Sequence, residues 1–230
     1  GLSPVNNEIE FLLASFATAF PHVPRHRRVK LFVSLTKTLG CAESMHLILF
    51  LMGQQYANNV HKNKNGDSQS VVEFVHGYMK SFSAEEQLAG IVAFTKLWND
   101  IPLNQLEPGS EEFEVLNNRP VFGTTIATLG QSGLAVLRND LLQFLDETLS
   151  SENKHELSSL KTKMALVLID DEDSEVSKKE LVLDKFRAIT SFALASLDTF
   201  TNSHADIKLC STLYSLLGNL LDLLPLNYFI

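Results

Sequence analysis

The most concentrated group of side chains able to do chemistry is a basic cluster near the start of the chain. It comprises Arg25, His26, Arg27, Arg28 and Lys30. The planar guanidinium of arginine binds phosphate and carboxylate oxygens through two parallel hydrogen bonds. The cluster is therefore a candidate contact for a phosphate group or an acidic partner.

The same cluster also has a structural interpretation. It stands at the start of a predicted helix, where the helix dipole disfavours cations. An acidic side chain on a neighbouring helix would compensate this charge, and the cluster would then join two helices. Lys62 and Lys64 follow in a later polar break and would extend the basic surface if both segments share one edge of the fold.

Patterns that support catalysis or cofactor binding are absent from the sequence. The seven histidines form no His-Glu-x-x-His motif and the two cysteines no Cys-x-x-Cys pair, so we predict no metal site. No Gly-x-Ser-x-Gly elbow and no phosphate-binding Gly-x-x-x-x-Gly-Lys loop occurs. The acidic run 170–175 lacks the glycine and trailing glutamate of an EF-hand loop. We therefore predict that the chain is not an enzyme and binds no cofactor or small-molecule substrate.

Three further residues of reactive type are assigned structural roles. His46 adjoins the apolar run 47–52, so we expect a hydrogen-bonded residue of the core or of a groove. Cys41 and Cys210 are expected to act as small buried apolar side chains.

Composition limits the classes of protein that remain. Nineteen Lys and Arg against 27 Asp and Glu give a formal net charge of −8 in 230 residues, which argues against a protein that coats nucleic acid. The longest apolar run, 47–52, is far shorter than the ~20 residues that span a bilayer. The sequence is that of a globular protein without membrane contact.

Apolar residues recur at helical spacing along most of the chain. The spacing predicts helices over about 9–20, 25–39, 42–58, 71–82, 84–98, 134–149, 157–168, 182–200 and 207–224. Asn6 or Asn7 is a candidate N-cap, and Gly40 is expected to end the second helix. Ser83 and Glu86 form a capping box, and the sequence 65–67 indicates a turn.

Residues from about 101 to 133 interrupt this periodicity. The stretch contains three prolines and four glycines, which predicts a long connection with one or two short helices. Residues 121–129 are rich in β-branched side chains, but nothing nearby offers a partner strand, so helix is preferred.

Helix–turn–helix units recur at roughly 35 to 45 residues, the period of HEAT and armadillo repeats. We predict an all-α protein, an α-solenoid of HEAT-like antiparallel helix pairs. A compact helical bundle is the alternative that periodicity alone leaves open.

The segment 20–40 is more specific than a generic HEAT unit, because a Pro-x-x-Pro-x-His-Arg-Arg sequence precedes a helix that ends in Thr-Leu-Gly. It resembles a recurrent segment of the very large HEAT-repeat subunits of the UtpA subcomplex of the small-subunit processome. Pro24, His26, Arg27, Arg28 and Gly40 match that motif. Residues 45–55 and 217–226 are similar to the same family.

The resemblance implies that residues 1–230 are a HEAT-like repeat segment of a longer, non-catalytic scaffold in ribosome biogenesis. Its expected location is the nucleus and nucleolus. Its expected partners are other UtpA and processome proteins, with pre-ribosomal RNA or small nucleolar ribonucleoprotein reached through the full complex. The alternative is a generic HEAT or armadillo solenoid that binds a peptide or cargo protein, as in transport.

Overall fold

The computed structural model describes residues 4–150, 159–169, 176–202 and 206–225. These residues form helices and loops, and no strand occurs among them, which confirms the all-α prediction. The helices are α1 (Pro4–Ala19), the 3₁₀ helix η1 (Phe20–His22), α2 (Arg25–Leu39), α3 (Cys41–His61), α4 (Asn65–Met79), α5 (Ala84–Asn99), α6 (Glu111–Asn117), α7 (Gly123–Ala127), α8 (Gln131–Thr148), α9 (Leu160–Ile169), α10 (Val176–Thr201) and α11 (Ile207–Leu221).

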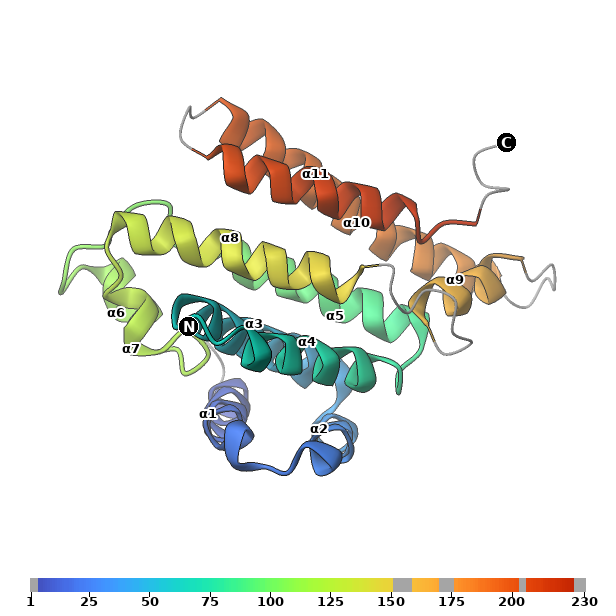
Figure 1. The fold of residues 1–230 in the computed structure, drawn as a ribbon, viewed down its shortest axis with the longest axis horizontal. Helices are drawn as coiled ribbons and strands as arrows, with labels where there is room; N and C mark the ends of the chain where they lie inside the picture. The colour runs from blue at the N-terminus through green and yellow to red at the C-terminus, as the bar shows by residue number, and fades with distance from the viewer. Residues whose placement is uncertain (1–3, 151–158, 170–175, 203–205, 226–230) are drawn as a thin grey trace.

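Within the described residues, the long helices follow one another along the chain as the pairs α1–α2, α3–α4, α5–α8 and α10–α11 (Figure 1). The first helices of these pairs pack against one another in one row, and the second helices pack in a second row. From α3 onward the two rows run in opposite directions across Figure 1. This arrangement of two rows, together with the absence of strands among the described residues, confirms the predicted all-α solenoid of HEAT-like helix pairs.

In the first two pairs, residues at equivalent positions of α2 and α4 contact each other, and the number of residues between them in the sequence is constant. Arg28 on α2 donates to the hydroxyl of Ser70 on α4, 42 residues later. Two turns further along, Thr36 and Tyr78 share a hydrogen bond across the same 42 residues. The separation lies within the predicted repeat period.

In the last two pairs, the contacting residues of α8 and α11 are also a constant number of residues apart in the sequence, and this number is larger. Thr212 on α11 donates to Asn139 on α8, and Asn219 donates to Asp146, both across 73 residues. The extra length belongs to the segments that connect the helices, so the packed rows themselves remain regular.

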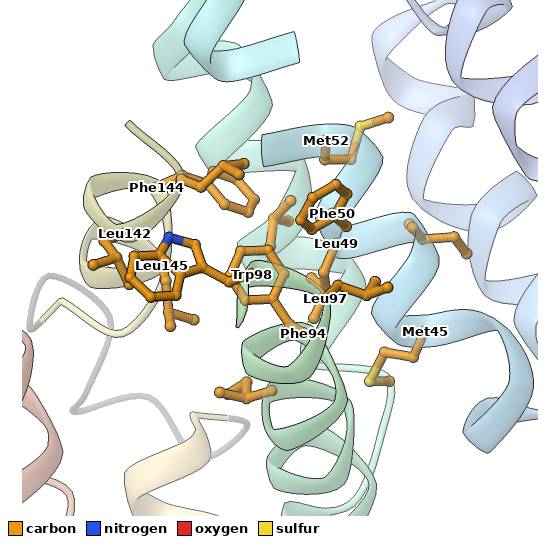
Figure 2. Close-up of a cluster of buried hydrophobic side chains, with 14 of the residues drawn as sticks. Met45, Leu49, Phe50, Met52, Phe94, Leu97, Trp98, Leu142, Phe144 and Leu145 are labelled. Atoms are coloured by element: carbon orange, nitrogen blue, oxygen red, sulfur yellow. The ribbon is translucent and has the colours of Figure 1, made fainter. Parts of the chain in front are cut away.

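Helix α3 lies at the centre of the stack, as its nearly continuous apolar sequence predicts. It packs against α1, α2, α4, α5 and α8. Figure 2 shows its Met45, Leu49, Phe50 and Met52 with side chains from α5 and α8. The ring of Phe50 lies 5.8 Å from that of Phe94. Each fully buried side chain of this size contributes roughly 1.5–3 kcal/mol to stability.

Two local signals are confirmed residue by residue. Helix α2 spans the predicted residues and ends at Gly40, whose φ of 98° favours glycine and whose N–H donates to the carbonyl of Thr36. The capping box before α5 is complete, because Ser83 accepts from the N–H of Glu86 while Glu86 accepts from the N–H of Ser83.

Two predicted boundaries are wrong. Helix α1 begins at Pro4, upstream of Asn6 and Asn7, because proline at the first helical position has the φ a helix needs and lacks only an N–H that would be unpaired there. Residues 65–67 form the first turn of α4 instead of a loop. The N–H of Asp67 donates to the carbonyl of Lys64, and its carboxylate is favoured near a helix N-terminus.

Helix α11 lies within the predicted range 207–224, and it buries one face of its apolar sequence. Ile207 is 88% exposed, whereas the buried leucines are Leu209, Leu213, Leu216 and Leu220. Ile207 stands at the first position of α11, ahead of the first buried leucine. The start of the predicted helix 157–168 and the acidic run 170–175 fall outside the described residues.

The connection between α5 and α8 contains α6 and α7 and reaches back to the first two helix pairs. Arg119 in this connection pairs with Glu10 on α1 at 2.7 Å, and the N–H of Val121 donates to the other oxygen of Glu10. Gln54 on α3 donates to the carbonyl of Val121 at 2.8 Å. A segment from the third pair is thus fastened to the first.

The close approach of α3 and α8 predicts the effect of adding one methyl group. A Cβ at Gly53 would lie 2.7 Å from Cδ2 of Leu141 and 3.0 Å from Cδ1 of Phe144. We expect Gly53→Ala to lower the free energy of unfolding by about 1–2 kcal/mol, because overpacking outweighs the gain in helix propensity. Gly218→Ala on α11, with open space around its Cβ, should raise it by up to about 1 kcal/mol. Urea unfolding followed by circular dichroism measures both, and equal stabilisation would contradict the close packing.

The pairing of Glu10 with Arg119 predicts a second stability effect. Glu10 is 2% exposed, so Glu10→Gln leaves a half-buried guanidinium without its carboxylate and should lower the free energy of unfolding by about 2 kcal/mol. Asp100 contacts the same guanidinium at 3.4 Å but is 55% exposed. Asp100→Asn should therefore cost under about 1 kcal/mol. Thermal melting of both variants checks the difference, and equal losses would show that the buried pair has no special role.

Candidate functional site: the basic edge

The two basic groups singled out in the sequence lie at the same end of neighbouring helices. Arg25 opens α2, and Lys62 and Lys64 lie in the turn that leads into α4. The contact of Arg28 with Ser70, near the start of α4, places the beginnings of α2 and α4 side by side. We call the exposed basic residues at this end the basic edge: Arg25, His26, Arg27, Lys30, Lys62 and Lys64.

Arg28 is not part of this surface, because its side chain is buried. Its guanidinium donates to the carbonyls of Val23 and Pro21, at 2.9 and 3.4 Å, and stacks over the ring of Phe20 at 4.2 Å. Burial lowers the pKa of Arg28, and the charge of Arg25 lowers it further. The prediction of a partner contact is therefore wrong for Arg28, which instead holds the turn between α1 and α2.

The compensation expected for the basic cluster takes a different form at Arg28. Backbone carbonyls and the Ser70 hydroxyl surround the guanidinium, and the negative charge of Asp67 on α4 acts in its favour. Carbonyl oxygens accept hydrogen bonds from the N–H groups of an arginine, so its guanidinium needs no buried carboxylate as a partner.

The remaining members of the basic edge are exposed to solvent. Arg25, Arg27 and Lys30 lie on the first two turns of α2, and Lys62 and Lys64 extend the surface toward α4. Asp67 adds one negative charge beside them. Flexible exposed cations of this kind attract phosphate groups and acidic side chains, with a strength that falls as salt increases.

One contact between a histidine and a carboxylate, close to the basic edge, has no signature in the sequence. His61 at the end of α3 lies 3.3 Å from the carboxylate of Asp140 on α8, and their side chains are 57% and 4% exposed. Burial raises the pKa of Asp140, while the nearby His61 and Lys208 and a hydrogen bond with the side chain of Asn139 oppose this effect. The two residues are far apart in the chain, so only the stacking of α3 on α8 reveals the pair.

His46 is half-buried in α3, as predicted, but its expected hydrogen bond is not found at one ring nitrogen. Within the described residues, Nδ1 has no hydrogen-bond partner. Burial lowers the pKa of His46 to about 4, and the nearby charge of Arg119 contributes. The ring is therefore neutral at physiological pH.

The cysteines are half-buried free thiols that share no site. Burial raises the pKa of Cys41 to about 11, with the charges of Glu86 and Glu43 acting in the same direction. A thiol of this kind is a poor nucleophile.

No group of three or more histidine, cysteine or carboxylate side chains that would hold a metal ion occurs in the part of the chain that the structure describes. Among its helices, none has the length and apolar content needed to cross a membrane.

Comparison with curated proteins gives similarity along the whole chain. U3 small nucleolar RNA-associated protein 10 of Debaryomyces hansenii is 54% identical over 233 residues, which cover 100% of this chain and 12% of that protein. The protein of the same name from Scheffersomyces stipitis is 48% identical, with 100% and 13% covered. That of Saccharomyces cerevisiae is 29% identical, with 97% and 14% covered.

The chain thus spans about one eighth of the length of these relatives. No solved structure matches it. The family described as HEATR1-like, HEAT repeats matches residues 4–190, which include α1 to α9 and the first part of α10. With its stacked helix pairs, and with a match over most of its length, the chain belongs to the HEATR1-like HEAT-repeat family.

Proposed function

We propose that this chain is a non-catalytic scaffold segment of a longer ribosome-biogenesis protein. In this role it supports assembly of the small-subunit processome and processing of pre-ribosomal RNA, in the nucleus and nucleolus. Its partners are other UtpA and processome proteins, and contact with RNA is confined to the basic edge. The observation that carries the proposal is the similarity, along the whole of this chain, to one part of proteins named for association with U3 small nucleolar RNA.

The packing of the chain supports a scaffold. Large apolar side chains fill the contacts between successive helices, so the solenoid is a rigid stack that presents its helix ends and connections to partners. The reactive side chains with shifted pKa values, His46 and Cys41, are held in unreactive forms. These features favour a binding role over an enzymatic one.

The basic edge supports contact with a phosphate-bearing or acidic partner. Its cations are exposed on two successive helix pairs, while the one buried arginine, Arg28, fixes the backbone beneath them. The chain as a whole carries a net charge of −8, so the basic edge attracts RNA or an acidic protein surface against the overall charge of the molecule.

The charge reversal Arg25→Glu with Arg27→Glu tests the proposal. Both side chains are exposed, so the melting temperature should change by less than about 3 °C. Capture of processome proteins from yeast nuclear extract by the tagged chain should fall about tenfold. Lys37→Glu with Arg187→Glu makes the same change in charge away from the basic edge and should leave capture unchanged.

Recovery of transport factors without nucleolar proteins would contradict the proposal and favour a cargo-binding solenoid. If the double variant captures processome proteins as well as the unmodified chain, partners use another surface. Binding of a single-stranded RNA 20-mer, followed by fluorescence anisotropy at several salt concentrations, separates RNA contact from protein contact. Two lost phosphate contacts would reduce the salt slope by about 1.4.

Arg28 provides the contrasting prediction. Arg28→Met removes the donors to Pro21 and Val23 and should lower the free energy of unfolding by about 2 kcal/mol, because two part-buried carbonyls lose a charged donor. Urea unfolding measures this loss. If Arg28→Met weakens partner capture at unchanged stability, the assignment of Arg28 to the fold is wrong.

A further inference from the structure

A cavity of about 320 Å³ lies where α10 packs against α5, next to α8 and to the loop that follows α5. Its walls are mostly apolar and are formed by Trp98, Ile101, Leu103, Phe192 and Phe200. The exposed members of the lining, Leu103, Ala195 and Thr199, mark its opening to solvent. Ligand sites occupy ~300–1,000 Å³, so this cavity suits one or two side chains of a partner.

One charged side chain, that of Arg138 on α8, belongs to the lining that the structure describes. Its guanidinium is held in place from two sides. Nη1 donates to the carbonyl of Pro102 in the loop, and Cζ lies 5.7 Å from the centre of the Phe200 ring. The positive charge is therefore fixed at the wall of the cavity, between the loop and α10.

The guanidinium of Arg138 lacks acceptors. The residue is 4% exposed, and among the described residues only Nη1 has an acceptor, whereas Nε is enclosed without one. Arg28 is the contrasting case, because each of its three guanidinium nitrogens has an oxygen acceptor. A buried donor without an acceptor costs free energy, which a ligand with carboxylate oxygens would recover.

No carboxylate of the described residues forms an ion pair with Arg138. Burial lowers the pKa of Arg138, and the negative charge of Asp206 acts in the opposite direction. The carboxylate of Asp206 accepts from the N–H of Leu209 at the start of α11. Asp100, next to the lining, contacts Arg119 instead. The charge of Arg138 thus remains available to a carboxylate from another molecule.

We propose that this cavity, the Arg138 pocket, binds a glutamate side chain of a protein partner. The carboxylate accepts from the guanidinium of Arg138 and from the hydroxyl of Ser196, and the methylene groups pack against Phe192 and Phe200. Glutamate has the reach for this site, because the guanidinium is buried below exposed residues such as Thr199. Hydrogen bonds between a guanidinium and a carboxylate are among the stronger ones in proteins.

A single carboxylate matches the pocket better than a phosphate group. Arg138 is the one cationic residue among the described lining, and most of the wall is apolar. A phosphate monoester carries about two negative charges and three acceptor oxygens, which need several donors. The exposed cations that would attract the phosphates of RNA lie at the basic edge, on α2 and before α4.

The Arg138 pocket deepens the proposed function, because it rests on this chain being a binder of proteins. It names the chemistry of one partner surface, a glutamate flanked by apolar side chains that cover Leu103. The pocket lies where the last helix pair meets the third, so it is distinct from the basic edge on the first two pairs.

A short peptide and the single tryptophan of the chain test the pocket. Trp98 lines the cavity, and its Nε1 donates to the backbone carbonyl of Arg138 at 2.9 Å. The probe is the blocked pentapeptide Gly-Leu-Glu-Leu-Gly, titrated into the 230-residue chain while the indole N–H resonance of Trp98 is followed by NMR. We expect a saturable shift of this resonance.

Two altered peptides identify the group that is recognised. Replacing the glutamate by glutamine keeps the shape but removes the charge, and should weaken binding about tenfold or more. A phosphoserine peptide should bind more weakly than the glutamate peptide, because the pocket offers one cation and apolar walls. Tighter binding of the phosphoserine peptide would overturn the choice of a carboxylate.

Variants of the chain locate the interaction. Arg138→Met keeps most of the aliphatic length and removes the guanidinium, so the preference for glutamate over glutamine should disappear. Ala195→Phe fills the opening of the cavity and should weaken binding of the glutamate peptide about tenfold or more. Ala188→Phe is the matched control, because Ala188 is exposed on the same face of α10, about two turns earlier, and does not line the cavity. Its binding should equal that of the unmodified chain.

Equal binding of the glutamate and glutamine peptides, or a preference for glutamate that persists in Arg138→Met, would overturn the proposal. If Arg138→Met fails to fold, Ala195→Phe replaces it, and unchanged binding by Ala195→Phe would likewise overturn the proposal. The peptide titration needs no processome component, and the capture assay at Arg25 and Arg27 involves no residue of this pocket. Either proposal can therefore fail without the other.

Discussion

The structure depends on the burial of the middle of helix α3. This 21-residue helix packs against five others, every residue from Leu47 to Gly53 is buried, and the sequence from Leu47 to Met52 contains no polar side chain. Because protein interiors are close-packed, every neighbour of this helix is held in one position by the others. The glycines at positions 53 and 90 extend this constraint, since each lies where an added Cβ would meet a side chain of the adjoining helix.

The pairing of α3 with its neighbours also determines where the chemically active side chains lie. The turn after α3 carries Lys62 and Lys64 to the start of α4, beside the first turns of α2. The end of the same helix brings His61 to Asp140. The exposed cations are therefore displayed together at one end of the solenoid, on backbone that the packed core supports.

Features set by neighbouring residues were predictable from the sequence. The helix from Arg25 to Leu39 follows from its apolar spacing and from Gly40, and the capping box needs only Ser83 and Glu86. The all-α class and the repeat follow in the same way from periodicity. The beginning of α4 was missed because the sequence Asn-Gly-Asp fits a turn and also fits the first turn of a helix. In the helix, the acidic side chain is stabilised by the helix dipole.

Features set by distant residues were not predictable. Arg27 and Arg28 are adjacent and chemically identical, yet Arg27 is exposed, whereas Arg28 lies on the buried face of α2 and donates to carbonyls of the turn before that helix. Glu10 and Arg119 lie 109 residues apart, and no local pattern connects them. Their contact has a mechanical consequence. In an ideal solenoid each repeat touches only its neighbours, so the molecule flexes like a spring and unfolds one unit at a time. The contact between Glu10 and Arg119 joins the first helix pair directly to the third. The first three pairs therefore bend and unfold together, as one rigid part of the solenoid.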